Sequence, residues 1–385
     1  MTTEVETVGR AAPAEGHLGI DIGGSKVAAR WQPAEGGGHR EAVLRWTSGG
    51  VGEDVRVLRE LVQLVLPARG RAVLRGAAVA LPATVVHGQV IAWPSRPSWT
   101  DRNVPELFDA VLPGVAVAHE DDGNLAALAE ARRAGCPDLA YLGVGTGLGG
   151  GVVSGGVLVR GPRGHAGEIG HLVIAVEPAT RCVCGRVGCL QSAASGPALL
   201  DLAARLRGRP VRDAAELRSG LVERRAWAER TLRRGAGALA IAAVGLSELM
   251  QCAQVRIGGG FAAALPELTE AVRAALPAFA RAGWTPPRVL PAAYGADASL
   301  AGAVLLARHV SADLEDRDER CAHVQDSPRA ELPTRAHEPS PGLGDRVLGL
   351  AQRTGPDEHA HDLAAGLPLV HGDVLDSPAV RERVH

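Results

Sequence analysis

Long apolar segments are missing from this chain of 385 residues. A membrane-spanning helix needs roughly 20 consecutive apolar residues, and no run in the sequence reaches that length. The first residues, MTTEVETVGRAAPAEG, are acidic and lack the apolar core of a signal peptide. These absences predict a cytoplasmic protein with no membrane partner.

A surplus of charge is missing as well. The chain has 41 Lys and Arg residues against 43 Asp and Glu residues, for a formal net charge of -2, and no basic patch stands out in the sequence. Nucleic-acid binding depends on basic side chains that contact phosphates, so we expect no nucleic-acid partner. About 18 residues precede the first predicted strand, which is too few for the helix-turn-helix of a DNA-binding repressor.

Cysteines are few, and three of the six are gathered in one short segment, RCVCGRVGC. The other three, Cys136, Cys252 and Cys321, are scattered without a pairing pattern, which argues against a disulfide framework. In a reducing compartment a cysteine cluster indicates metal or redox chemistry. The spacing C-x-C-x4-C, with glycines between the last two cysteines, is typical of a tight knuckle around an ion.

A histidine upstream of this knuckle completes a set of four candidate metal ligands, which are His171, Cys182, Cys184 and Cys189. Three thiolates and one imidazole fill a tetrahedron around a metal ion, and such a closed site leaves no position for water or substrate. The residues therefore predict a structural metal site. The alternative is that they are small buried side chains in a loop rich in turns.

Glycine-rich turns recur three times in the sequence. The first lies in HLGIDIGGSKVAARW, which predicts strand, turn and strand, with the turn made by Asp21, Gly23, Gly24, Ser25 and Lys26. A Walker loop or a dinucleotide fingerprint would continue into a helix, whereas the short alternating run after this turn is typical of a hairpin. The amides of such a turn can hold a phosphate, but one glycine hairpin alone is a weak signal.

The second and third glycine runs strengthen that signal. The segment LAYLGVGTGLGGGVVSGGVLV predicts another hairpin, whose loop contains Gly145, Thr146, Gly147 and Gly149. In VRIGGGFAAAL, Gly258, Gly259 and Gly260 would let the backbone approach a base or a ribose. Two hairpins of the phosphate-binding type, one at the start of each α/β half, predict one nucleotide held in a cleft between the halves.

Two adjacent acids, Asp121 and Asp122, lie where a predicted strand, GVAVAHE, gives way to a predicted helix, NLAALAEARR. An acid at such a junction is aimed at a cleft, and the neighbouring glycine runs favour a functional role. The alternative is an ordinary Asp that caps the N-terminus of the helix.

These segments together resemble the ROK family of sugar kinases and repressors, which includes bacterial glucokinases. The resemblance runs from about Gly19 to about Ala307, and its most specific pieces are GPRGHAGEIGHLVI and CVCGRVGCLQS. It implies an α/β protein with the two-domain hexokinase/actin-like ATPase (ribonuclease H-like) fold and a cleft between the domains. The domains would be residues 17–120, completed by a helix at about 298–310, and residues 121–297 with a zinc loop. A homodimer is also implied.

The same resemblance implies roles for matching positions of this sequence. Asp122 would be the general base, and Asp21 would orient Mg²⁺ through water. ATP would place its phosphates at the first two glycine turns and its adenosine beside the third glycine run. Glu168 and His171 would bind hydroxyls of the acceptor. Zinc would be held by His171 and the three cysteines of the knuckle.

Several positions depart from the family pattern, and these departures cluster at the implied acceptor site. Asp121 replaces an Asn, and Gln191 replaces a Glu. Ser95 and Arg96 stand where glucokinase-like members tend to have Asn-Leu. Each change alters which acceptor hydroxyl meets a charged or planar hydrogen-bonding group.

We therefore predict a kinase whose acceptor is not plain glucose. The favoured acceptor is a C7 cyclitol of secondary metabolism, phosphorylated on its exocyclic primary hydroxyl. Two alternatives stay open: a glucokinase or other hexose or amino-sugar kinase, and a sugar-binding regulator without catalysis.

From about Ser311 onward the sequence is charged, contains prolines and lacks apolar periodicity. Such a segment cannot bury enough apolar surface to fold alone. We predict a disordered tail over residues 311–385.

Overall fold

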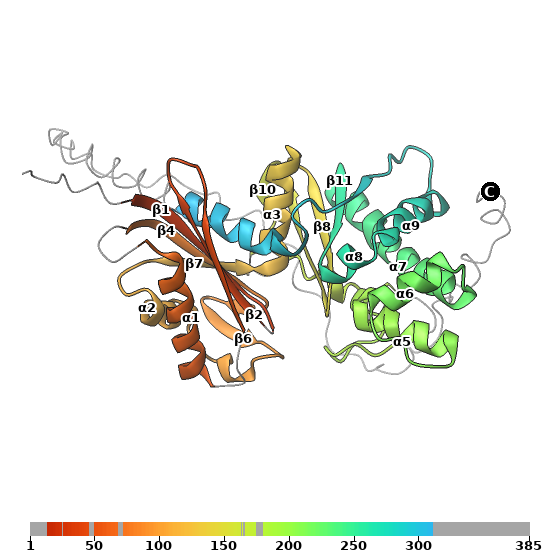
Figure 1. Cartoon of the computed structure of the whole chain (residues 1–385). Coiled ribbons are helices and arrows are strands. Elements are labelled where there is room, and N and C mark those ends of the chain that lie inside the picture. Colours follow the sequence, from red (N-terminus) through yellow and green to blue (C-terminus); the bar gives the residue numbers. More distant parts are fainter. Residues whose placement is uncertain are drawn as a thin grey trace, which may run out of the picture. The chain divides into compact units, whose positions relative to one another are not determined.

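The computed structural model describes residues 14–24, 26–45, 50–67, 72–162, 164, 166–174 and 180–310 (Figure 1). Ser25 and the predicted tail, residues 311–385, lie outside these ranges. The described residues belong to one compact unit. Within the described ranges, no helix is long and apolar enough to cross a membrane.

The first half of the chain builds a five-stranded sheet in the order β3-β2-β1-β4-β7. Its strands are β1 (Ala14–Ile22), β2 (Lys26–Pro33), β3 (Arg40–Arg45), β4 (Ala72–Leu81) and β7 (Val117–Asp121). β2 pairs antiparallel with β1 and β3, whereas β4 lies parallel to both β1 and β7. Residues 16–20 of β1 are all buried, as a central strand covered on both faces requires.

Two helices and a short hairpin accompany this sheet. They are α1 (Val51–Val65), α2 (Val104–Val111), and the strands β5 (Thr84–Val86) and β6 (Gln89–Ala92), with the single turn η1 (Pro97–Trp99) before α2. α1 buries an apolar stripe at helical spacing that includes Leu58, Leu61 and Val65. Trp93 and Trp99 join the same core and meet edge to face, with ring centroids 4.9 Å apart. This core fixes the loop between β6 and α2.

A second five-stranded sheet follows, in the order β10-β9-β8-β11-β12. Its strands are β8 (Leu139–Val144), β9 (Leu148–Ser154), β10 (Val157–Leu158), β11 (Gln254–Gly258) and β12 (Arg288–Pro291). The longer helices around it are α3 (Asp122–Ala134), α5 (Gly196–Arg207), α6 (Ala214–Val222), α7 (Ala226–Met250) and α9 (Glu267–Ala275). Shorter ones are α4 (Leu190–Ala194), α8 (Gly260–Ala264), η2 (Ile169–His171), η3 (Leu276–Phe279) and η4 (Gly295–Asp297).

One more helix, residues 298–310, reaches back to the first sheet. Ala303 and Leu306 share a buried cluster with Ala80 of β4 and Leu125 of α3. Gly302 makes this approach possible, because a Cβ at that position would lie 2.0 Å from the carbonyl oxygen of Leu125. The helix therefore packs against elements of both halves.

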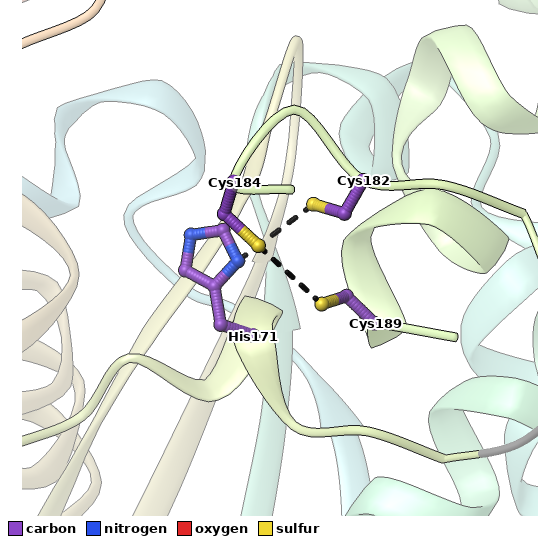
Figure 2. A group of neighbouring side chains, drawn as sticks. All are labelled: His171, Cys182, Cys184 and Cys189. Carbon is purple, nitrogen blue, oxygen red and sulfur yellow. Dashed lines mark hydrogen bonds between the residues drawn. The ribbon is translucent and has the colours of Figure 1, made fainter. Parts of the chain in front are cut away.

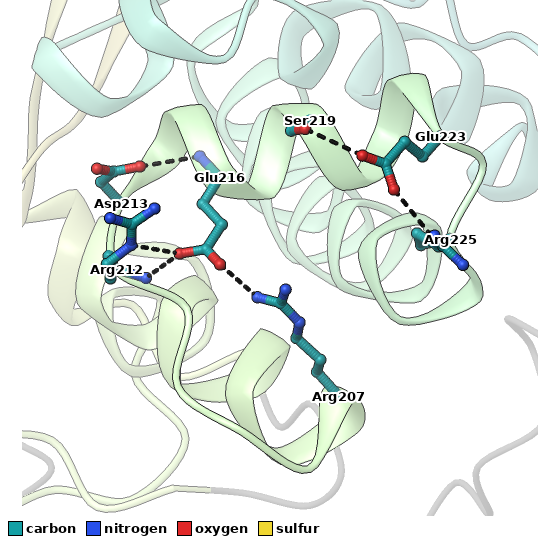
Figure 3. Close-up of polar contacts among 7 residues, drawn as sticks. All are labelled: Arg207, Arg212, Asp213, Glu216, Ser219, Glu223 and Arg225. Carbon is teal, nitrogen blue, oxygen red and sulfur yellow. Dashed lines mark hydrogen bonds and ion pairs between the residues drawn. The ribbon is translucent and has the colours of Figure 1, made fainter.

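Ten arginines lie on α5, α6, the start of α7 and their connections, so basic charge is more concentrated here than the balanced composition indicates. Figure 3 shows how acids of the same region meet them. Glu216 accepts hydrogen bonds from Arg207 (2.6 Å) and Arg212 (2.9 Å), and Glu223 accepts one from Arg225 (3.0 Å). Arg207 and Arg212 lower the pKa of Glu216 to about 2. Part of the basic charge is thereby neutralised within the fold.

Candidate active site

The first glycine turn presents Asp21 near the end of β1. β1 and β2 form the predicted hairpin, with Asp21 opposite Ala28, and the amide of Gly23 donates to the carbonyl of Lys26 (3.0 Å) to close the turn. Ser299, in the helix of residues 298–310, donates its hydroxyl hydrogen to Oδ2 of Asp21 (3.0 Å). Segments from the two ends of the described chain therefore fix this carboxylate.

Asp121 and Asp122 lie at the N-terminus of α3, where the chain leaves β7. Oδ1 of Asp121 accepts hydrogen bonds from the amides of Gly123 (3.0 Å) and Asn124 (3.3 Å), so Asp121 caps the helix. Asp122 is the first helical residue, and its Oδ1 lies 3.9 Å from the position that a Cβ of Gly149 would occupy. The two acids therefore differ in role: Asp121 caps α3, and Asp122 lies beside the second glycine turn.

The carboxylates of Asp21, Asp121, Asp122 and Glu168 influence one another. Burial and the negative charge of Asp122 raise the pKa of Asp21 to about 7. Burial, followed by the charges of Asp122 and Glu168, raises the pKa of Asp121 well above its usual value. Burial also raises the pKa of Asp122, with a contribution from Glu168. This concentration of negative charge favours the binding of a cation.

The second and third glycine runs lie next to each other. β8 and β9 form the predicted hairpin, and the amide of Gly145 donates to the carbonyl of Gly147 (2.9 Å). Gly259, with φ of +87°, is so close to β8 that a Cβ would lie 2.5 Å from the carbonyl oxygen of Val144. The amide of Gly196 donates to the carbonyl of Gly145 (2.9 Å). The expected phosphate loop and the expected adenosine loop are thus neighbours.

A cavity of about 520 Å³ adjoins the acids, and the residues that line it include Leu81, Ala83, His119, Asp121, Arg160 and Glu168. Asn124, fully buried, supports two residues that line this cavity, Glu120 and Ala166. Its side-chain amide donates to Oε1 of Glu120 (3.0 Å) and to the carbonyl of Ala166 (3.1 Å), while Arg160 forms an ion pair with Oε2 of Glu120. These bonds hold the loop before Glu168 against α3.

The four candidate metal ligands converge, and their donor atoms all lie within 4.8 Å of one another (Figure 2). Sγ of Cys184 lies 3.7 Å from Sγ of Cys189, and Nδ1 of His171 lies 3.8 Å from Sγ of Cys182. In a tetrahedral site, zinc–sulfur bonds of about 2.3 Å place two sulfurs about 3.8 Å apart. The spacing and the chemistry of these donors therefore fit zinc.

Glycines give the knuckle its shape. Gly185 (φ +91°) and Gly188 (φ +82°) both take the left-handed conformation, and the amide of Gly185 donates to the carbonyl of Cys182 (3.0 Å). Glu168 immediately precedes η2, and His171 is its last residue. One turn of chain therefore joins the metal ligands to the cavity.

Gln191, expected at the acceptor, has both ends of its amide bonded to the protein. Oε1 accepts a hydrogen bond from the amide of Leu148 (3.0 Å), and Nε2 donates to Sγ of Cys182 (3.8 Å). The side chain thus joins the metal ligands to the second glycine hairpin. A Glu at this position could not donate to a thiolate, so the departure from the family pattern has a structural consequence.

Arg96, also expected at the acceptor, takes part in a buried ion pair. Its Nη1 donates to Oδ1 of Asp54 (2.6 Å), and Nε1 of Trp99 donates to Oδ2 of the same carboxylate (2.7 Å). These bonds anchor the loop between β6 and α2. Ser95 in this loop stays close to the first glycine turn, with Oγ 3.9 Å from the position that a Cβ of Gly24 would occupy.

No role was predicted from the sequence for two residues of this site, Ser299 and Asn124. Ser299 lies 278 positions from Asp21, and no local pattern connects residues at such a separation. Asn124 could have been singled out. The ROK family has the run N-D-A-N at the positions of residues 121–124, and Asn124 matches its last residue. Its bonds to Glu120 and Ala166 show that this residue supports the cavity wall.

Comparison with known proteins agrees with this architecture. The sequence profile described as the ROK family matches residues 17–310. Kanosamine kinase of Amycolatopsis mediterranei is 44% identical over 307 residues, which cover 77% of this chain and 97% of that protein. The crystal structure of a ROK hexokinase from Thermus thermophilus has 31% identity and a TM-score of 0.65, and covers 77% of this chain and 99% of its own.

A ROK family glucokinase from Streptomyces griseus, crystallised in complex with glucose and AMPPNP, has 26% identity and a TM-score of 0.64. The match covers 76% of this chain and 99% of that one. These likenesses confirm the predicted two-domain hexokinase/actin-like ATPase fold. The family profile and the extent of these matches establish that the chain belongs to the ROK family.

Proposed function

We propose that this sugar kinase transfers the γ-phosphate of ATP to a primary hydroxyl of an amino sugar whose amine carries a positive charge. The observation that carries the proposal is the carboxylate of Asp121 at the cavity. Asp121 stands where the family has an Asn, and Asp122 and Glu168 raise its pKa, after burial. An ammonium group at hydrogen-bond distance from Asp121 would offset the repulsion between its carboxylate and those of Asp122 and Glu168, whereas a neutral hydroxyl would not. The relative that is 44% identical carries the name of an amino sugar, kanosamine.

Asp122 is the proposed general base, which takes the proton of the acceptor hydroxyl. Because burial and Glu168 raise its pKa, this carboxylate holds a proton more readily than an ordinary Asp does. Phosphoryl transfer otherwise depends on position and charge, and Asp122 is fixed as the first residue of α3. Glu168 and His171 lie on the neighbouring turn and would bind acceptor hydroxyls.

The glycine turns would hold ATP. Its phosphates would lie at the turns of both hairpins, and its adenosine would lie along Gly258, Gly259 and Gly260. The residues of the two turns are Gly23, Gly24, Lys26, Gly145, Thr146, Gly147 and Gly149. Asp21 would hold Mg²⁺ through water. A carboxylate with a pKa of about 7 next to Asp122 fits a cation there. When bound, Mg²⁺ supplies positive charge to the phosphoryl group that is transferred.

Zinc would be held by His171, Cys182, Cys184 and Cys189. In a closed site of this kind the ion stabilises the fold. Here it would fix the turn that carries Glu168, so that the acceptor is held in one position. Nε2 of His171 would stay available to the acceptor, because Nδ1 faces Cys182.

The C7 cyclitol expected from the sequence stays a prediction. It rests on departures from the family pattern, and two of those residues, Arg96 and Gln191, are bonded to Asp54, Leu148 and Cys182 within the protein. Asp121 lines the cavity, and its carboxylate fits an amine directly. We therefore favour the amino sugar over the cyclitol and over glucose.

Asp122→Asn tests the base. The amide keeps the size of the side chain but cannot accept the proton, so kcat should fall roughly 100-fold or more. ATP affinity should stay within about threefold of the wild type. Asp201→Asn, at an exposed position of α5, serves as the control. Near-normal turnover of Asp122→Asn would remove this residue from the mechanism.

Cys184→Ser tests the metal centre. Loss of one of four ligands should lower the zinc content, measured by elemental analysis, to well below one ion per chain, and it should lower the melting temperature. Cys136→Ser is the matched control, because Cys136 lies outside the cluster and its sulfur donates to the carbonyl of Asp138 (3.4 Å). Wild-type protein purified without zinc would refute the assignment.

Asp121→Asn tests the acceptor. Asn is a good helix cap, so α3 should keep its N-terminus while the charge is lost. The ratio of kcat/KM for kanosamine to kcat/KM for glucose should fall about 10-fold to 100-fold. Asp213→Asn, a capping Asp on α6, controls for the cap alone. A wild type that prefers glucose, with an unchanged ratio in Asp121→Asn, would contradict the proposal.

A further inference from the structure

Glu130 is a buried carboxylate that the proposed chemistry does not use. It lies on α3, two turns after Asp122, and its exposed fraction is 0%. Burial of a carboxylate is unfavourable unless hydrogen bonds or a cation meet its charge. Backbone amides meet it here: Oε1 accepts from Ala293 (2.8 Å) and Tyr294 (2.9 Å), and Oε2 accepts from Ala293 (2.9 Å). Glu130 therefore holds the backbone of residues 293–294.

The segment that Glu130 holds leads to Asp21. It begins after β12, where the amide of Ala292 donates to the carbonyl of Ile257 (2.8 Å), and it continues through η4 into the helix of residues 298–310. Five residues after Tyr294, Ser299 donates to the carboxylate of Asp21. A short stretch of backbone thus connects the Glu130 carboxylate to Asp21.

The same carboxylate is connected to Asp122 through α3. Eight helical steps separate the two residues, a distance of about 12 Å at about 1.5 Å per residue. Asp122 directly follows β7, which lies in the same sheet as β1, so the sheet sets the spacing of the two backbones. The segment of residues 293–299 acts instead on the side chain of Asp21, through the hydroxyl of Ser299. An error of about 1 Å in such a site can lower the rate about 100-fold.

The third glycine run lies beside this junction as well. A Cβ at Gly258 would lie 2.7 Å from Cβ of Ala292 and 2.7 Å from the hydroxyl of Tyr141. After burial, the negative charge of Glu130 is the largest influence that raises the pKa of Tyr141. α3, residues 292–294 and the expected adenosine loop therefore meet around Glu130.

We propose that Glu130 is a positioning residue that holds the hydroxyl of Ser299 on the carboxylate of Asp21, and so aligns this carboxylate with Asp122. This inference rests on the proposed phosphoryl transfer, in which Asp21 serves the nucleotide side and Asp122 the acceptor side. Glu130 touches neither reactant. It acts through residues 293–299 on one side and through α3 on the other.

Glu130→Gln tests the inference. Gln keeps the volume and one accepting oxygen, but its NH₂ group would face a backbone amide, so the hold on residues 293–294 weakens. We expect kcat per folded molecule to fall about 10-fold or more, with the acceptor KM within about threefold of the wild type. Glu270→Gln, at an exposed position of α9 that pairs with Arg273, should leave both constants unchanged. A rise in the acceptor KM by the same factor as the fall in kcat, or an unchanged kcat, would overturn the positioning role.

Ser299→Ala supplies an independent check. If Glu130 acts on Asp21 through Ser299, the loss of kcat in the double variant should match that of the more impaired single variant. If the fold-losses of kcat in the two single variants multiply in the double variant, the inference is overturned.

Hydrogen exchange separates this inference from the proposed function. In the whole protein, the backbone amide hydrogens of residues 292–299 and of the segment around Asp21 should exchange with solvent at least about 10-fold faster in Glu130→Gln than in the wild type. Unchanged exchange in both segments would overturn the inference whatever the activity. A wild type that phosphorylates no sugar would overturn the proposed function, and the exchange data would still decide whether Glu130 holds these two segments.

Discussion

Repulsion among carboxylates in one partly buried space is the constraint on which this site depends. Asp21 and Asp121 lie at the carboxyl ends of β1 and β7, which run parallel to β4 between them, so the sheet brings both acids to one edge. Burial raises the pKa values of the three aspartates, and the neighbouring charges of Asp122 and Glu168 add to this rise. The fold tolerates this because amides at the start of α3 and the hydroxyl of Ser299 meet these acids, and a helix N-terminus favours negative charge.

Such a cluster prefers cationic ligands, and this preference connects the parts of the proposed function. Mg²⁺ near Asp21 and an ammonium near Asp121 would each lower the repulsion that the protein sustains alone. Other parts of the structure hold these acids in position. The bonds of Asn124 hold the cavity wall, and Gln191 joins Cys182 of the cysteine knuckle to the second hairpin. A zinc ion in the knuckle would in addition fix the turn of Glu168.

Local patterns were enough to predict the glycine hairpins, the strand-to-helix junction before Asp122 and the cysteine knuckle, because each depends on neighbours in sequence. Partners that are distant in sequence were not predictable. The bond of Arg96 to Asp54 was not predicted, because Asp54 lies on a helix 42 positions earlier. The bond of Gln191 to Leu148 was not predicted for the same reason, since it spans 43 positions. The raised pKa values follow from burial, which spacing alone does not reveal.

Titration calorimetry of the wild type with kanosamine and with glucose, between about pH 5.5 and 7 and in buffers of different ionisation enthalpy, tests the central claim most directly. Over this range the amine stays largely protonated, whereas the carboxyl group of Asp21, whose pKa is about 7, increasingly loses its proton and adds to the negative charge of the cluster. A cation binds the ionised cluster, so kanosamine should release protons on binding, and its affinity should rise at least about fivefold toward pH 7. Glucose should show a much weaker dependence. A kanosamine affinity that is independent of pH, with no proton release, would contradict the account.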